Sequence, residues 1–510
     1  MTRESTASPA PTAPTAPTAP ATPHAAHPTR AAAHRLALPV VLAGLFMTIL
    51  DFSIVNVAIP SIQGGLHASA AEIQFVVAGY GLAYGAGLVI GGRLGDRFGR
   101  RRLYLVGTVA FTLSSALCGL APTAIMLVVG RLLQGAAAAL LFPQVLSILN
   151  VTYTGAARAR AFRWYALVLG TAWVGGQVLG GVLIKADLWH SDWRICFLIN
   201  LPIGAATIVL TRRTVAESRS ATARRLDLRG AALVTTGLVL LVYPLVEGRE
   251  AGWPAWSFGC LAAAAPVLVG FLRFQVRLSD KGGTPLVEPA LLRSRAFLLG
   301  IATVFATYAG MASFFLVFAV YLQEGEGYDA LGSGLAFLPL GVGFFATSLL
   351  SGQVGRIVGH RAISVGAGAL GTAETALVIV ALAEGAHVDA WELALPLVFT
   401  GVGMGMVLTP LIARVLNGID PDHAGSASGV LSTTQQVGNS VGVALIGIVF
   451  YGRLNAASVP CGLLYAHAFA SSLVFEIAIA ACVGVLALIL PRNAGTRPVD
   501  YGPVTEREEP

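Results

Sequence analysis

Two oppositely charged side chains stand inside otherwise apolar runs of this chain, Asp51 in LDFSIVNVAIPSI and Arg131 in GRLLQG. An ionised group inside a membrane is costly, so each residue is a functional hypothesis from the outset. Counted as helices with a rise of ~1.5 Å per residue, Asp51 lies ~16 Å and Arg131 ~10 Å below the outer ends of their runs. The comparable depths predict an ion pair in the outer half of the membrane, because either charge alone would be strongly disfavoured there.

Such a pair could act as a proton switch. Burial favours the neutral form of an acid, and a nearby guanidinium favours the carboxylate. A movement that separates Asp51 from Arg131, or a cationic substrate that binds Asp51, would therefore change the proton occupancy of the carboxyl group. The alternative is a static buried salt bridge. We favour the switch, which predicts that Asp51→Asn uncouples transport from the proton gradient while the protein still folds.

A dense cluster of charge occupies GGRLGDRFGRRR, from Gly91 to Arg102, between two apolar runs. Its glycines permit a tight reversal and close helix approach, and its arginines surround Asp96. Arginines beside a span hold a loop on the cytoplasmic side, which is the simplest interpretation of this stretch. The pattern recurs as GQVGRIVGHR, from Gly352 to Arg361, with Arg356 in place of the acid. Two related halves in a polytopic membrane protein point to a transporter.

The composition excludes an ordinary soluble protein. Of the 510 residues, 55% are hydrophobic and 12% are charged, against roughly a quarter charged in soluble domains. The basic residues fall in short loops, so the net charge of +7 is orientation information and predicts no nucleic-acid partner. The five cysteines support neither a disulfide framework nor a metal site. No nucleophile motif or ATP-binding loop is present, so we predict that the chain is not an enzyme.

Apolar runs of about twenty residues predict an all-α polytopic membrane protein with fourteen spans. They lie near 36–62, 72–91, 103–122, 124–150, 162–184, 193–211, 228–246, 256–274, 297–322, 331–352, 362–383, 392–416, 424–451 and 467–490. Of the 33 Lys and Arg residues, 28 fall on the side of the two chain ends and four on the other, which predicts that both termini are cytoplasmic. The two glycine-rich loops follow spans 2 and 10, so spans 1–6 pair with spans 9–14.

This 6+2+6 arrangement divides the chain into five parts. We expect a disordered, Pro/Ala/Thr-rich cytoplasmic tail, a first six-helix half, a linker with two inserted helices, a cytoplasmic loop with the second half, and a second cytoplasmic tail. Their bounds are 1–35, 36–211, 212–274, 275–490 and 491–510. The segment 212–229 holds six arginines, which we expect to orient the chain rather than to bind anionic lipid.

Three further features lie inside the spans. Gly176 and Gly180 of span 5 are four residues apart, a spacing that predicts close packing on a neighbouring helix. Glu374 in span 11 and Glu476 in span 14 are embedded acids, for which we favour a packing or lipid-interface role over a part in proton coupling.

Together these stretches resemble the major facilitator superfamily, specifically its fourteen-span drug:proton antiporters. GRLGDRFGRR resembles the loop after span 2, LDFSIVNVAIPSI the span 1 motif, RLLQG the span 4 motif, and GQVLGG the span 5 motif, with Gln177 where proline is usual. The resemblance covers roughly residues 36 to 490. It implies proton coupling by Arg131, a cytoplasmic latch formed by the charged loop, and a seal between the halves formed by span 5. The gating residues are then Gly92, Asp96, Arg97, Gly99, Arg100, Arg101, Gly176, Gly180 and Gly181.

The substrate cavity is expected between spans 1, 4, 9 and 12, with spans 2, 5, 10 and 13 beside them. Aromatic, flexible and amide side chains there would suit bulky amphiphiles held by stacking and adaptable packing. The candidates are Phe46, Met47, Gln134, Phe305, Tyr308, Phe314, Met404, Gln435 and Asn439.

We therefore predict a bacterial inner-membrane antiporter that exports amphipathic organic compounds, such as drugs and antibiotics, by alternating access. Its partners are the small-molecule substrate, protons and the lipid bilayer, and the proton gradient supplies its energy without a cofactor. No obligate protein partner is evident. An uptake symporter is the nearest alternative, and a non-transporting membrane sensor or assembly partner is another.

Overall fold

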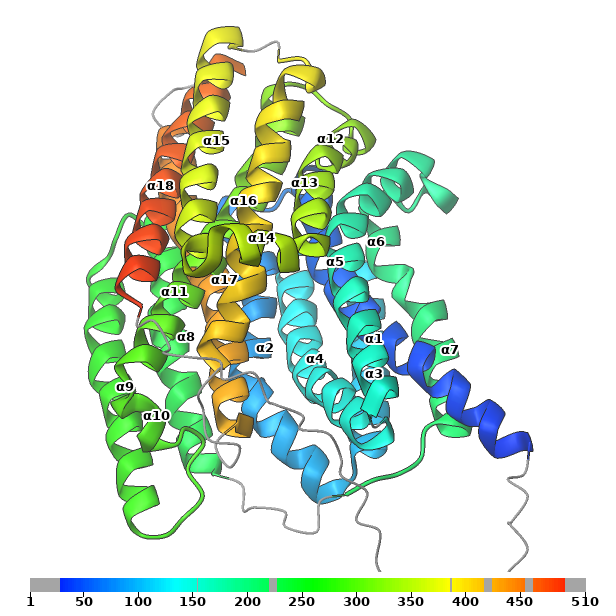
Figure 1. Cartoon of the computed structure of the whole chain (residues 1–510). Helices are drawn as coiled ribbons and strands as arrows, with labels where there is room; N and C mark the ends of the chain where they lie inside the picture. Colours follow the sequence, from blue (N-terminus) through cyan, green and yellow to red (C-terminus); the bar gives the residue numbers. More distant parts are fainter. Residues whose placement is uncertain are drawn as a thin grey trace, which may run out of the picture.

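The computed structural model describes residues 28–153, 155–219, 227–385, 388–416, 424–454 and 462–490. In this part of the chain the regular elements are helices, and they form one bundle in which α1 begins at the lower right and α18 runs downwards along the left-hand side (Figure 1). The predicted tails, apart from the start of the first helix, lie outside the described residues. That helix begins at Pro28, ahead of the predicted start of the span at residue 36.

Six long helices form the first half. They are α1 (Pro28–Leu66), α2 (Ala70–Phe98), α3 (Arg100–Gly119), α4 (Ala124–Thr152), α5 (Gly155–Ala186) and α7 (Asn200–Thr214), the last preceded by the turns η1 (Leu188–His190) and η2 (Asp192–Arg194) and by α6 (Ile195–Leu198). Side chains cap the outer starts of two of them. Ser69 accepts the backbone N–H of Glu72 at the start of α2 while the Glu72 carboxylate accepts that of Ser69, a capping box. Thr123 accepts the N–H of Met126 at the start of α4.

The second half contains eight helices and two turns. They are α11 (Arg295–Val320) with the π-turn η3 (Tyr321–Gly325), α12 (Ala330–Ala336), α13 (Leu338–Leu349), α14 (Ser351–Val358) with η4 (Gly359–Arg361), α15 (Ala362–Glu384), α16 (Ala390–Leu416), α17 (Ala424–Leu454) and α18 (Gly462–Ile489). In the first half α1 packs on α5, α2 on α4, and α3 on α4 and α7. In the second half α11 packs on α17, α13 on α16, and α15 on α16 and α18. The two halves therefore have the same internal packing.

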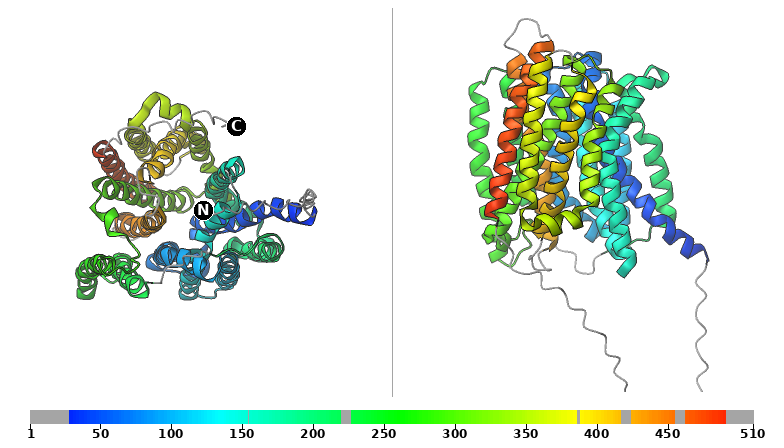
Figure 2. Two further views of the ribbon diagram at one scale, coloured as in Figure 1. Left: turned by 60° about the horizontal axis from the view of Figure 1, so that its bottom comes forward. Right: turned by 45° about the horizontal axis from the view of Figure 1, so that its top comes forward.

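In the sequence, the helices α8 (Leu228–Glu250) and α9 (Ala255–Asp280) come between the two halves, and they pack on each other. The short α10 (Pro289–Arg293) leads on to α11. α8 also contacts α2 and α17, and Figure 2 shows the pair at one edge of the bundle. The inserted helices therefore cover one side of the boundary at which α2 meets α17.

Twelve helical segments among the described residues are long and apolar enough to cross a membrane. A thirteenth is α5 if its two parts count as one span, because it bends by 41° between Leu167–Trp173 and Gly175–Ala186. The bend occurs although Gln177 replaces the usual proline. The structure is thus that of an all-α membrane protein with twelve to thirteen candidate spans, and α2 is not among those segments.

Candidate functional site

The two charges singled out by the sequence meet inside the first half. Arg131 Nη1 of α4 donates a hydrogen bond to Asp51 Oδ2 of α1 across 2.5 Å, and both residues are fully buried. Gln134, one turn along α4, accepts from Arg131 Nη1 at 2.8 Å and donates to Asp51 Oδ1 at 2.8 Å. Residues three apart lie on the same face of a helix, so the amide bridges both charges.

Asn200, at the start of α7, is a third partner of the carboxylate that the sequence analysis missed. Its Nδ2 donates to Asp51 Oδ1 at 2.7 Å and lies 3.0 Å from Ser115 Oγ of α3. The sequence signal was a single amide in an apolar run, which looks like any polar residue packed in a core. With three side-chain donors and no exposed atom, the Asp51 carboxylate is bound from α4 and α7 at once.

α2 holds Arg131 from the opposite side. Arg131 Nε donates to Val76 O at 2.9 Å, and the guanidinium carbon lies 4.3 Å from the centre of the Tyr80 ring, a cation–π distance. A buried ion that loses its partner is strongly destabilised. Any step that neutralises Asp51 or moves it from Arg131 must therefore rearrange a network that joins α1, α2, α4 and α7.

The charged stretch after the second predicted span forms less of a loop than the sequence indicates. α2 continues to Phe98 and α3 begins at Arg100, so the reversal is made at Gly99, which has a φ of 113° that favours glycine. Gly92 and Gly95 lie within α2, where Gly95 allows α4 to approach: an added Cβ would stand 1.8 Å from Gln144 Oε1. The side chain of Asp96 lies outside the described part of the structure, so its latch role stays a prediction.

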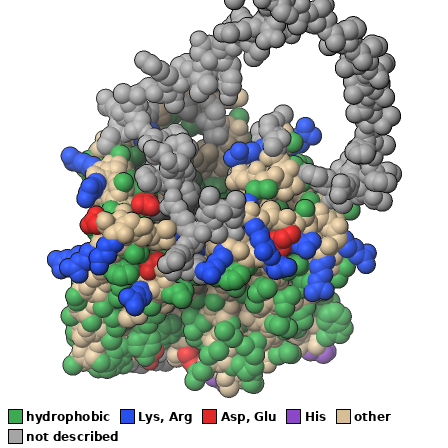
Figure 3. Space-filling view, turned by 90° about the horizontal axis from the view of Figure 1, so that it is seen from below, with side chains coloured by type: hydrophobic (Ala, Val, Ile, Leu, Met, Phe, Trp, Pro, Cys, Tyr) green, Lys and Arg blue, Asp and Glu red, His purple; other side chains and the backbone are tan. Residues whose placement is uncertain are grey.

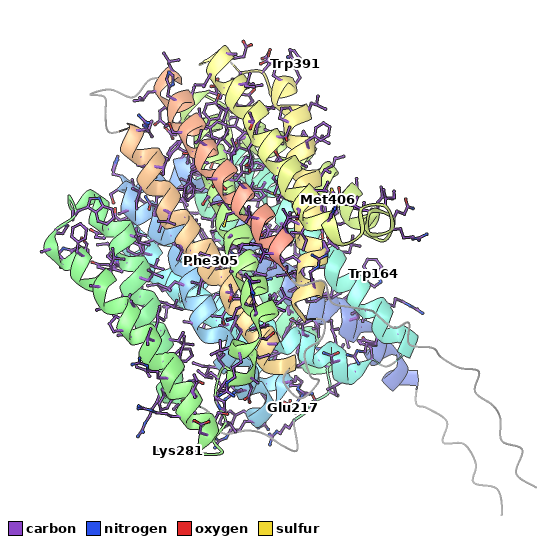
Figure 4. The ribbon with its side chains drawn as sticks, turned by 60° about the vertical axis from the view of Figure 1, so that its left-hand side comes forward. Trp164, Glu217, Lys281, Phe305, Trp391 and Met406 are labelled. Atoms are coloured by element: carbon purple, nitrogen blue, oxygen red, sulfur yellow. The ribbon has the colours of Figure 1, made fainter. Side chains whose placement is uncertain are left out.

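Glu217, from the arginine-rich segment after α7, binds the start of α3. Its Oε1 accepts the backbone N–H of Arg101 at 3.1 Å and its Oε2 accepts that of Arg102 at 3.2 Å. The Nε atoms of the same two arginines lie 3.9 and 3.8 Å from the carboxylate. A carboxylate at a helix N-terminus satisfies orphan donors and complements the helix dipole. Part of the predicted linker therefore docks on the turn, near the lower end of the molecule (Figure 4).

The other arginines of this stretch have different surroundings. The Arg93 guanidinium donates to the backbone carbonyls of Thr284 and Pro285, in the segment between α9 and α10. The Arg97 side chain lies over the ring of Phe98, 5.4 Å from its centre. The Arg100 backbone N–H donates to Ser218 O at 3.0 Å. Of these, Arg93 connects the first half to the chain that leads into the second.

The glycines of α5 face two different neighbours. A Cβ on Gly176 would meet Ser53 Oγ at 1.9 Å, and one on Gly180 would meet Ile54 Cγ1 at 2.8 Å, both on α1 of the same half. A Cβ on Gly181 would instead meet Ala330 O at 2.4 Å, on α12 of the other half. Close packing on a neighbouring helix therefore occurs at all three, and at Gly181 that neighbour lies across the boundary between the halves.

Further contacts join the halves at the upper end. Lys185 Nζ, at the end of α5, lies 2.8 Å from Asp329 Oδ2, which precedes α12. The hydrogen bond from this lysine holds the pKa of Asp329 below its ordinary value. Gln323 in the π-turn after α11 donates to Val57 O of α1 at 3.0 Å, so a local widening of the helix places an amide across the boundary.

The predicted cavity residues do not gather in one place. Gln435 Nε2 donates to Tyr308 OH at 2.9 Å, Asn439 Nδ2 donates to Gln436 Oε1 at 3.3 Å, and Gln134 is bound to the ion pair. Met47 is buried in the core of the first half, with Phe46 packed against that core. Phe314 stacks on Phe318 and shares a small cavity with Met404, whereas Phe305 lines an apolar groove beside α8 (Figure 4). Their substrate contacts stay a prediction.

Two tyrosines that the sequence analysis did not single out, Tyr84 and Tyr165, lie near the predicted cavity residue Tyr308. Tyr84 of α2 lies within electrostatic range of Tyr165 of α5 and Tyr308 of α11. With Gln435 of α17, which is hydrogen-bonded to Tyr308, they form a group of polar and aromatic side chains contributed by both halves.

Comparison with known proteins decides the family. The family model described as Major Facilitator Superfamily matches residues 41–443, most of the chain. The chain belongs to the Major Facilitator Superfamily. A probable actinorhodin transporter of Streptomyces coelicolor is 38% identical to it over 84% of this chain and 75% of that protein. The puromycin resistance protein pur8 of Streptomyces alboniger is 32% identical over 89% and 90%, and the tetracenomycin C resistance and export protein of Streptomyces glaucescens is 31% identical over 81% and 76%.

This membership confirms the resemblance to the drug exporters of the superfamily, and with it a multi-pass membrane transporter rather than an enzyme. A solved structure, that of an auto-inhibited POT family peptide transporter, matches with a TM-score of 0.65 over 91% of this chain and 99% of that chain. The two sequences are 17% identical, so this likeness shows the fold alone. It confirms the predicted major facilitator fold.

Proposed function

We propose that this major facilitator protein is a proton-driven antiporter that exports amphipathic antibiotics and related compounds by alternating access between its two halves. The observation that carries the proposal is the fully buried Asp51–Arg131 pair with its two amide partners. A relative, the tetracenomycin C resistance and export protein, supports the direction of transport. An embedded acid that belongs to a network joining four helices is suited to exchange a proton during a conformational change.

The proposed topology has fourteen spans, with α2 and the bent α5 both crossing the membrane and both termini in the cytoplasm. Lys and Arg side chains gather on the lower face of the molecule (Figure 3), the face that the positive-inside rule assigns to the cytoplasm. On this basis the five predicted parts stay the proposed division of the chain, with α8 and α9 as the inserted pair, but α1 begins at Pro28 and α9 continues to Asp280, beyond the predicted bounds at 35 and 274.

In this orientation the structure represents a conformer joined at its external end. Lys185–Asp329, Gln323–Val57 O and the approach of Gly181 to α12 all lie there. The turn at Gly99, with Glu217 bound to it, lies at the cytoplasmic end. We assign the first set to the external seal and the turn to the cytoplasmic latch of the transport cycle.

The group of Tyr84, Tyr165, Tyr308 and Gln435 is the proposed centre of the substrate path. Aromatic faces with hydroxyl and amide groups at their edges bind flat amphipathic molecules by stacking and adaptable hydrogen bonds. The Tyr80 ring connects this group to the ion pair, since it lies 5.9 Å from the Tyr84 ring and 4.3 Å from the guanidinium carbon of Arg131. Asp51 itself is fully buried, so substrate binding and proton binding are coupled through these side chains rather than by direct competition.

Substrate-induced proton release from detergent-solubilised protein tests the proposal. Wild type, Asp51→Asn and the control Asp280→Asn, an exposed acid at the end of α9, are compared across a panel of cationic and neutral antibiotics. Release by wild type and the control, but not by Asp51→Asn, is the expected result. Equal release by all three proteins would show that the released proton does not come from Asp51. No release with any compound would favour a sensor, and uptake in vesicle counterflow would favour a symporter.

A further inference from the structure

Two buried acids of the second half face one cavity. Glu374 of α15 and Glu476 of α18 line a cavity of about 30 Å³, measured as the volume that the centre of a water-sized molecule can occupy. The two helices pack side by side (Figure 1). The remaining lining comes from α11 and α16, including Gly310, Met311 and Met404, and from apolar residues of α15 and α18. Among the described lining residues of all four helices, the two glutamates are the only ionisable groups, and α17 adds none.

Both carboxyl groups direct unpartnered oxygens into this space. Glu374 is 4% exposed and Glu476 2% exposed, and neither Glu374 Oε2 nor Glu476 Oε1 has a hydrogen-bond partner within the described part of the chain. Gly310 of α11 leaves the room that Glu476 occupies, because a Cβ there would stand 2.8 Å from its Oε2. The acids are therefore neither salt-bridged, as Asp51 is, nor turned towards lipid.

The chemistry of the cavity selects its ligand. Two carboxylates close together in low dielectric with no cation beside them cannot both stay ionised. A water needs about 10–15 Å³ of such space, so the cavity has room for roughly two waters. Drug-sized ligands need some hundreds of Å³, and Ca²⁺ needs about six to eight oxygen ligands. A proton, with one or two waters, is the ligand that fits.

We propose that Glu374 and Glu476 form a second proton-binding site, enclosed within the second half, that holds at least one exchangeable proton independently of Asp51. The cavity is lined by α11 and α16, the first and fourth predicted spans of that half, as well as by α15 and α18. The protein would then carry one proton site in each half. The existence of this site does not require that the protein be an antiporter.

The test is the infrared carbonyl-stretch band of protonated carboxyl groups in the full-length protein in lipid bilayers. In an Asp51→Asn background we expect this band near neutral pH, shifted on transfer to D₂O and removed by the double substitution Glu374→Gln/Glu476→Gln. Glu384→Gln, an exposed acid at the end of the same α15, is the matched control and should leave the band unchanged. A band that survives in a folded double variant overturns the proposal.

Isotope labelling of the unmutated protein keeps the test decisive if the double variant fails to fold. Carbon-13 in the glutamate side chains should move the band, whereas carbon-13 in the aspartate side chains should not move that component. A wild-type spectrum without a glutamate component overturns the site. Neither experiment measures substrate-induced proton release, so a failure of the antiport proposal and a failure of this site are told apart.

Discussion

Substitution of Gly181 by alanine should open the external seal between the two halves. An added Cβ would stand 2.4 Å from Ala330 O and 2.8 Å from Leu331 Cα. Both are backbone atoms across the boundary, so no side chain can rotate away, and α5 or α12 must shift by roughly 1 Å to restore ordinary contact. Overpacking of this kind costs about 1–3 kcal/mol. Since each ~1.4 kcal/mol is tenfold in an equilibrium constant, the externally closed conformer should lose about 5- to 150-fold in population relative to the open one.

The assay is the distance distribution between spin labels on exposed external residues, Trp189 of the first half and Trp391 of the second (Figure 4), in a variant without native cysteines. Gly181→Ala should move the distribution to longer distances and lower turnover. Gly175→Ala is the matched control on the same helix, because its Cβ would meet nothing within 4 Å. Gly180→Ala, which clashes within its own half, should lower stability without lengthening the distance. Identical distributions for Gly181→Ala and Gly175→Ala would refute the reasoning.

Two further sets of contacts carry predictions. Asp329→Asn should keep the cap on α12, since asparagine caps as well as aspartate, but it should lose the ion pair with Lys185. Because an exposed pair is worth about 0.2–1 kcal/mol, the same spin labels should report a loss of the externally closed conformer of about 1.4- to 5-fold. Lys185→Gln should give the same change. The lowered pKa of Asp329 means that the contribution of this pair to closure is complete above its ordinary pKa of 3.8 and is lost only as the pH falls through the lowered value. External closure should therefore not change through this pair between about pH 5 and 8, and a response in that range that disappears in Asp329→Asn would contradict the assignment. Glu217→Gln should weaken the binding of the Arg101 and Arg102 amides by about 1–2 kcal/mol and speed their hydrogen exchange roughly 5- to 30-fold, with α16 as the internal reference; unchanged exchange would show that Glu217 does not hold the turn.

The sequence located the charged centre of the first half because charge in an apolar run is rare enough to stand out. Asp51 and Arg131 could be paired by depth alone, since a helix has a fixed rise per residue. Asn200 and the Val76 carbonyl could not be found in that way. A neutral amide is a common core residue, and a backbone acceptor carries no signal in side-chain type, so both depend on which helices become neighbours.

The cavity residues failed to converge for a related reason. Assigning Met47 or Phe314 to a span does not say which face of the helix turns to the other half, and in an apolar bundle every face is hydrophobic. The structure turns Met47 into the core of its own half. Glu217 was equally beyond prediction, because it binds α3 across more than a hundred residues of sequence. Gly99 was recoverable, since a reversal between two helices favours a residue that adopts positive φ.

α2 connects the buried ion pair to the boundary between the halves. Val76 O accepts from Arg131 Nε at 2.9 Å, and two residues along the same helix Ala78 O accepts from Ser440 Oγ of α17 at 2.9 Å. A change of charge at the aspartate acts on the guanidinium, and through it on the backbone of α2. The next turn of α2 is closely packed on α17, because a Cβ on Gly81 would stand 2.7 Å from the same Ser440 oxygen. Packed interiors transmit small displacements rather than absorbing them, so on the proposed mechanism a proton that binds Asp51 would also displace α17 of the second half.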